Sequence, residues 1–80
     1  MIIPLDLQGT LATDPEILGG AVRFKGTRVP LQALLDTILA GESLDYFLDD
    51  FPDVTKTQAL PVLNWESNET RKVFGLELVA

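Results

Sequence analysis

The chain has 80 residues, 46% of them apolar, which is the size and composition of one compact domain. Its net charge of −6 disfavours strong unassisted binding to nucleic acid. It has no cysteine and no histidine, which excludes disulfides, thiolate metal sites and Ser/His or Cys/His nucleophiles, so we expect no enzyme activity and no cofactor. No apolar run reaches the roughly 18–20 residues of a membrane span, and Met1–Asp6 lacks the features of a signal peptide, so we expect a cytoplasmic protein that does not engage membranes.

The first predicted elements are short. Apolar residues favour a strand over 2–7, with Pro4 marking it as an edge strand, and a second weak strand over 10–12. Asp14-Pro15-Glu16 is typical of a helix start, because aspartate can cap, proline fits the first helical position and glutamate suits the positive end of the dipole. Gly19-Gly20 ends this helix within about a turn.

A β-hairpin is predicted over residues 22–29. Apolar and basic residues alternate in Val22-Arg23-Phe24-Lys25, which places the apolar pair on one face and the basic pair on the other. Gly26 supplies the positive φ of the turn. Anion binding by Gly26-Thr27-Arg28 is one interpretation; we favour a tight turn in which Thr27 bonds the backbone and Arg28 pairs with an acid of a following helix.

Three helices follow the hairpin. Leucine and isoleucine repeat at i, i+3, i+4, i+7 and i+8 over 31–39, with Pro30 at the first helical position. Ser43 caps a second helix whose apolar stripe runs over 44–51. The third begins at Thr55, which forms a capping box with Gln58.

The last third of the chain combines a proline inside a predicted helix with an apolar tail. Pro61 lies about six residues into the third helix, where it removes a hydrogen bond, so we expect a kink there or a break with a new helical segment. The apolar tail over 70–80 alternates at Phe74, Leu76 and Leu78 as a strand does. This tail packs internally or in a homodimer, or it docks on a protein partner.

Charge is distributed unevenly along the chain. Residues 36–53 contain six acids and no base, whereas three of the six bases fall within 23–28. The acidic stretch predicts either a solvated face that aids solubility or a face that docks a basic partner. Asp45, Asp49 and Asp53 recur every four residues, a spacing better explained by a solvated helix face than by a metal site.

Several segments together resemble one family. Asp14-Pro15-Glu16-Ile17-Leu18-Gly19-Gly20, Lys25-Gly26-Thr27-Arg28-Val29-Pro30, Ala40-Gly41-Glu42-Ser43 and Phe51-Pro52-Asp53-Val54-Thr55 occur in order at close spacing. The pattern, over about 11–65, is similar to the family catalogued as domain of unknown function 433. That resemblance implies a helix-turn-helix, homeodomain-like fold. It also implies a VapB-like antitoxin that pairs with a PIN-like ribonuclease toxin.

We therefore expect a single, mainly α domain over 1–80: a trihelical, helix-turn-helix-like bundle with a small N-terminal β-hairpin. The residues that match the family motif, and that we assign to structure, are Gly20, Gly26, Thr27, Arg28 and Pro30. The candidate partner-binding residues are Phe74, Leu76, Leu78, Asp45 and Asp49. The candidate DNA-binding residues are Arg23, Lys25, Arg28, Lys56, Thr57 and Gln58.

Three functional hypotheses follow. The favoured one is an antitoxin-like protein that binds and neutralises a PIN-type ribonuclease and represses its own operon. The second is a dimeric helix-turn-helix DNA-binding regulator without a toxin partner. With either function we expect a homodimer or higher homo-oligomer, and the isolated chain should bind DNA only weakly. The third is a structural oligomer with no toxin partner.

Overall fold

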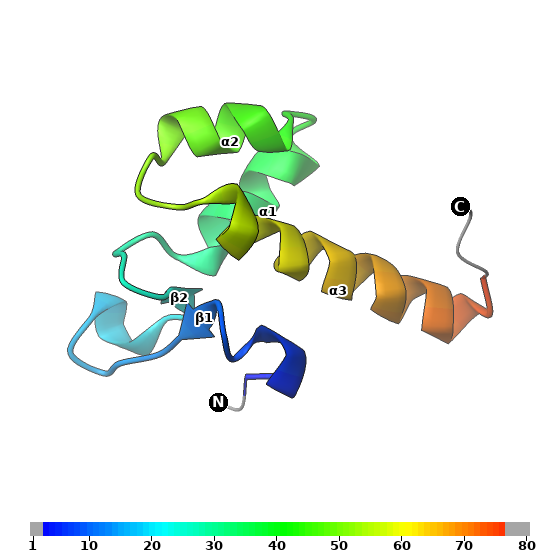
Figure 1. The fold of residues 1–80 in the computed structure, drawn as a ribbon, viewed down its shortest axis with the longest axis horizontal. Helices are drawn as coiled ribbons and strands as arrows, with labels where there is room; N and C mark the ends of the chain where they lie inside the picture. Colours follow the sequence, from blue (N-terminus) through cyan, green and yellow to red (C-terminus); the bar gives the residue numbers. More distant parts are fainter. Residues whose placement is uncertain (1–2, 77–80) are drawn as a thin grey trace.

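The computed structural model describes residues 3–76 and confirms a mainly α fold with a small antiparallel strand pair. In Figure 1, α1 and α2 lie above the strand pair, and α3 crosses between the two layers and projects beyond them. The elements in chain order are η1 (Leu5–Leu7), β1 (Leu11–Ala12), η2 (Leu18–Gly20), β2 (Arg23–Phe24), α1 (Leu31–Leu39), α2 (Leu44–Asp50) and α3 (Lys56–Phe74), where η denotes a 3-10 helix.

The strand pair is short and is reinforced by the returning chain. Leu11 lies opposite Phe24 in the antiparallel register of β1 and β2. After the turn, the chain comes back beside β2, where the Phe24 N–H donates to the Val29 carbonyl at 3.1 Å and Arg23 bridges to Pro30. The predicted turn over 22–29 is therefore present, but the ladder partner of β2 is β1.

The core joins every one of these elements except η2. Phe24 from β2 and Phe47 from α2 are both fully buried, and their ring centroids lie 6.1 Å apart. Phe51 extends this aromatic contact, 5.0 Å from Phe47. The buried core residues are Leu7, Leu11, Phe24, Val29, Leu34, Phe47, Val54, Ala59 and Val62. Phe24 and Val29, from the two sides of the predicted hairpin, thus pack on the helices.

The predicted helix starts are confirmed in two cases. The Ser43 hydroxyl accepts the Tyr46 N–H at 3.0 Å at the start of α2. At α3, Thr55 and Gln58 form the reciprocal capping box. Pro30 precedes α1 as its N-cap and is not its first helical residue.

The predicted strand over 2–7 is wrong for the residues that the structure describes. The Leu7 N–H donates to the Pro4 carbonyl at 2.9 Å, and the Gln8 N–H donates to the Leu5 carbonyl at 3.2 Å, so the chain forms η1. These local bonds satisfy the backbone without a neighbouring strand. Only Leu7 is buried in this turn, and one anchored side chain imposes no alternation.

The predicted helix start at Asp14 is also wrong. The Asp14 carboxylate accepts the Glu16 N–H at 2.9 Å, and its carbonyl accepts the Ile17 N–H at 2.9 Å, which closes a turn. Aspartate offers the backbone this alternative to a helix. Three consecutive positive φ angles over 18–20, of 54°, 63° and 87°, then prevent helix propagation.

Of the kink or break predicted at Pro61, the break is wrong, since α3 continues through this residue. Figure 1 shows the helix running on past this point without interruption. Pro61 has no N–H to donate to the carbonyl of Thr57, and Thr57 is an exposed residue in the first turn. Water can hydrate that carbonyl, so the helix tolerates the missing bond.

The predicted C-terminal strand is wrong as well, because α3 extends to Phe74. Gly75 ends the helix in the left-handed conformation with a φ of 66°, and the Leu76 N–H donates to the Arg71 carbonyl at 2.8 Å. The two bases in the last turn, Arg71 and Lys72, suit the negative end of the helix dipole. Leu78 lies outside the described residues.

Candidate functional site

The family-motif turn is built around the Thr27 hydroxyl. It donates to the Phe24 carbonyl at 2.9 Å and accepts the Val29 N–H at 3.0 Å. Gly26 precedes it with a φ of 74°, as the turn requires. These bonds agree with the interpretation of 26–28 as a tight structural turn. Nothing about them singles out an anion site.

The two arginines of this turn differ in their surroundings. Arg23 is half-buried, and its Nη1 lies 3.4 Å from both the Phe24 and the Thr27 carbonyl oxygens, while its buried Nε has no partner among the described residues. Arg28 is exposed and forms no ion pair with any residue between 3 and 76. The expected pairing of Arg28 with an acid of α2 or α3 is therefore not observed. Arg28 is open to an outside partner, whereas Arg23 folds back on its own turn.

Residues 23–28, called the basic turn below, lie against the first turn of α3. The side-chain amide of Gln58 donates to the Lys25 carbonyl at 2.9 Å, and the Thr10 hydroxyl donates to the Gln58 carbonyl at 2.6 Å. Exposed Lys56 and Thr57 belong to the same turn of α3 as Gln58. Four of the candidate DNA-binding residues therefore lie in adjoining segments: Lys25, Lys56, Thr57 and Gln58.

Gln58 itself differs from the other candidates. Its Oε1 accepts the Thr55 N–H at 3.1 Å, so both ends of its amide are engaged within the protein. A DNA base could hydrogen-bond to the Gln58 amide only by displacing one of these two bonds. Gln58 positions its neighbours, and sequence reasoning missed this role because its partner Lys25 is remote in the chain.

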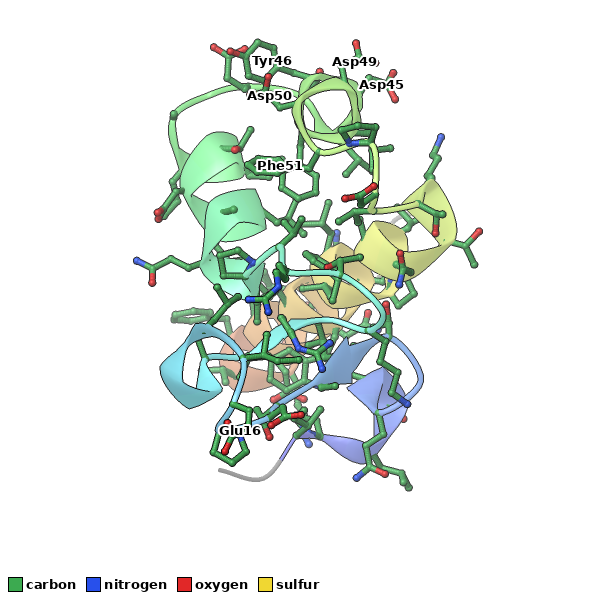
Figure 2. The ribbon with its side chains drawn as sticks, turned by 90° about the vertical axis from the view of Figure 1, so that its left-hand side faces the viewer. Glu16, Asp45, Tyr46, Asp49, Asp50 and Phe51 are labelled. Carbon is green, nitrogen blue, oxygen red and sulfur yellow. The ribbon has the colours of Figure 1, made fainter. Side chains whose placement is uncertain are left out.

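The acidic candidates lie on the outer face of α2. Figure 2 shows Asp45, Asp49 and Asp50 pointing away from the body together with Tyr46, whereas Phe51 points inward, and Glu16 lies at the opposite end of the molecule. These three aspartates are exposed and form no ion pair within the part of the chain described. No group of three or more acids between residues 3 and 76 is arranged to hold a metal ion.

The end of α3 exposes apolar side chains. Val73 is 73% exposed, Phe74 72% and Leu76 57%. This part of α3 projects from the body in Figure 1. Phe74 and Leu76 were predicted as partner-binding residues from a strand pattern, and the structure places them at and just beyond a helix end. The glycine at 75, following two bases, is the sequence signal that indicates this helix end.

A hollow lies between η1 and α3, and the sequence did not predict it. Its lining combines a carboxylate, two amides and two apolar rings, contributed by Asp6, Pro61, Asn64, Trp65 and Asn68. Trp65 is half-buried and packs against the core. On α3, the hollow extends from Pro61 to Asn68, so it lies between the core and the projecting end of the helix.

The comparisons identify a family over the motif-bearing part of the chain. A family model described as a protein of unknown function, DUF433, matches residues 11–65. No curated protein and no solved structure matches the chain. Among the helices that the structure describes, none is long and apolar enough to cross a membrane.

Proposed function

This chain belongs to the DUF433 family of proteins of unknown function, and we propose that it is an antitoxin-like protein that binds and neutralises a PIN-type ribonuclease. The observation that carries the proposal is the projecting end of α3, where Val73, Phe74 and Leu76 expose most of their surface. A helix that presents apolar side chains beyond its own core is suited to a groove on a partner protein. The proposed role is adhesion without catalysis, in the cytoplasm.

The acidic face of α2 supports the same role. Asp45, Asp49 and Asp50 are exposed on one helix, and the chain as a whole has a charge of −6. A ribonuclease that binds RNA presents positive charge around its substrate, because phosphate contacts dominate such binding. An acidic face would accelerate encounter with that surface, and the apolar end of α3 would retain the partner.

Co-purification tests this proposal. The protein, tagged and co-expressed with the product of the adjacent reading frame, should retain that product and suppress its toxicity. The double substitution Phe74→Ser with Leu76→Ser should abolish retention. Leu39→Ser is the matched control, because Leu39 is 85% exposed at the end of α1 and should leave retention unchanged. A neighbour that is neither toxic nor bound overturns the proposal.

A second candidate function is a dimeric DNA-binding regulator. It is favoured by the contact that holds the Lys25 carbonyl 2.9 Å from the Gln58 amide, because Gln58 belongs to the first turn of α3, the turn that also contains Lys56. The N-terminal residues of a recognition helix contact bases in helix-turn-helix proteins, and nearby bases contact phosphates. The two functions are compatible, because an antitoxin of this kind can repress its own operon.

A salt titration of duplex binding tests the second candidate. Affinity should fall steeply with salt. Lys25→Glu or Lys56→Glu should each reduce the slope of log affinity on log salt by about one for each protomer, and so by about two for the dimer. Leu39→Glu adds negative charge at the exposed end of α1, outside the basic turn and the start of α3, and should leave the slope unaltered. The absence of detectable binding at about 50 mM salt excludes this function.

A further inference from the structure

One stripe of α3 beyond the core carries a particular order of side chains. Trp65, Glu69 and Lys72 follow one another at i, i+4 and i+7, so they share a face of the helix, and Leu76 follows just past its end. Trp65 and Glu69 are half-buried, whereas Lys72 is exposed and Leu76 is 57% exposed. Read from the body outward, the order is apolar, acidic, basic, apolar.

This order is self-complementary when two copies run in opposite directions. Consider two α3 helices that run antiparallel and cross at a two-fold axis between positions 70 and 71. Glu69 of one copy then faces Lys72 of the other, and Trp65 faces Leu76. A parallel arrangement would instead place Glu69 on Glu69 and Lys72 on Lys72, which is unfavourable. The charges therefore select the antiparallel direction.

The hollow beside Trp65 fits the same arrangement. It opens between η1 and residues 61–68 of α3. In the antiparallel alignment, the apolar end of the other copy's α3 reaches this part of the helix. Leu76 of that copy would lie against Trp65 and Val73 against Asn68, two residues that line the hollow. Two equivalent hollows would each receive one helix end, as a two-fold interface requires.

The charge of the whole chain points to this segment as well. The chain carries −6, so most pairs of surfaces on two copies repel each other. Residues 66–76 contain two acids, Glu66 and Glu69, and two bases, Arg71 and Lys72, and so have no net charge. Two copies can meet through this segment without the general repulsion.

We propose that the occupant of the projecting α3 surface is a second copy of this chain, paired antiparallel through Trp65, Glu69, Lys72 and Leu76. This inference goes beyond the proposed function and is tested on the isolated protein. If both hold, a ribonuclease that binds Phe74 and Leu76 must compete with the second copy.

Charge reversal in separate chains is the first test. Glu69→Lys and Lys72→Glu should each raise the dimer dissociation constant about tenfold or more in sedimentation experiments, because each turns two attractive contacts into two repulsive ones. An equimolar mixture of the two variants should dimerise again, since both contacts are then between opposite charges. The double variant Glu69→Lys with Lys72→Glu should also dimerise, which shows that reversal leaves the fold intact. A mixture that stays monomeric, or single variants that dimerise like the unmodified chain, overturns the proposal.

Distance measurement is the second test. The chain has no cysteine, so Lys56→Cys supplies one attachment point for a spin label at the start of α3. Antiparallel pairing about the midpoint between 70 and 71 predicts about 44 Å between the two helix starts along the axis. Parallel pairing would bring them within roughly the 8–10 Å of two packed helices. The short distance, or a protein that remains monomeric at millimolar concentration, contradicts the proposal.

The fluorescence of Trp65, the one tryptophan of the chain, reports on the same contact. Its emission should shift to shorter wavelength as protein concentration rises through the dimer dissociation constant. Leu76→Ser should remove this shift, while Leu39→Ser should retain it. A concentration-independent emission in a chain that sediments as a dimer would mean that the copies meet elsewhere, which also overturns the proposal.

Discussion

The side-chain amide of Gln58 donates a 2.9 Å hydrogen bond to the main-chain carbonyl of Lys25, which joins two segments 33 residues apart. The Thr10 hydroxyl adds a second bond, to the Gln58 carbonyl, at 2.6 Å. The side chains of Thr10 and Gln58 thereby link the residue before β1, the basic turn and the first turn of α3. Small domains bury little apolar surface, so such directional contacts contribute a large share of their stability.

Substitution of Gln58 separates the contact with Lys25 from the helix cap. Gln58→Glu keeps an acceptor for the Thr55 N–H but loses the donor, and it places a carboxylate beside the Lys25 carbonyl. We expect a loss of about 1–2 kcal/mol in the free energy of unfolding, measured by urea denaturation. Gln58→Ala loses both bonds and should cost more. A Gln58→Glu variant as stable as the unmodified chain would show that the bond to Lys25 contributes nothing.

Gly26 and Gly9 offer a test of backbone conformation alone. A Cβ at either position would meet no atom within 4 Å, but Gly26 has a φ of 74° and Gly9 has no left-handed φ. Gly26→Ala should therefore cost about 1–2 kcal/mol of stability. Gly9→Ala should be neutral or stabilising by up to about 1 kcal/mol, because it restricts the unfolded chain. Thermal unfolding of the two variants measures the difference, and equal midpoints would mean that the turn relaxes at little cost.

The helical part of the fold was predictable because its signals are local. The stripe over 31–39, the Ser43 cap and the box between Thr55 and Gln58 each involve residues within a few positions of one another, and each is confirmed. Where the structure describes the segments 2–7 and 70–80, namely over 3–7 and 70–76, their strand patterns were misleading, since alternation indicates a strand only where a partner strand exists. Local bonds to the Pro4 and Arg71 carbonyls determined those segments instead, and bonds to Asp14 likewise replaced the predicted helix start.

The candidate site was predictable only as a set of residue types. Composition and charge indicated a basic turn and an acidic helix, and the structure places Lys25 against the first turn of α3 through Gln58. That proximity depends on a contact between remote positions, which periodicity does not encode. The hollow at Trp65 depends likewise on η1 packing against α3.

Phe47 tests the aromatic centre of the core. It is fully buried, with ring centroids 6.1 Å from Phe24 and 5.0 Å from Phe51. Phe47→Ala should cost about 3–5 kcal/mol, enough to unfold a domain of this size. Tyr46→Ala is the matched control: Tyr46 precedes it in α2, is 49% exposed, and should change stability by less than about 0.5 kcal/mol. Equal melting temperatures of the two variants would contradict the packing of α2.

Pro61 should be replaceable with a gain in stability. A proline in a helix interior costs about 3 kcal/mol, and its restriction of the unfolded chain returns about 0.4–1 kcal/mol. Pro61→Ala restores the N–H that can donate to the Thr57 carbonyl, so a net gain of about 2 kcal/mol is expected, equivalent to a rise in melting temperature of roughly 10 °C. Pro52→Ala is the control, because Pro52 is exposed and lies outside the helices, so its loss only frees the unfolded chain. If Pro61→Ala melts no higher than Pro52→Ala, then packing of the Pro61 ring beside Trp65 outweighs the missing hydrogen bond.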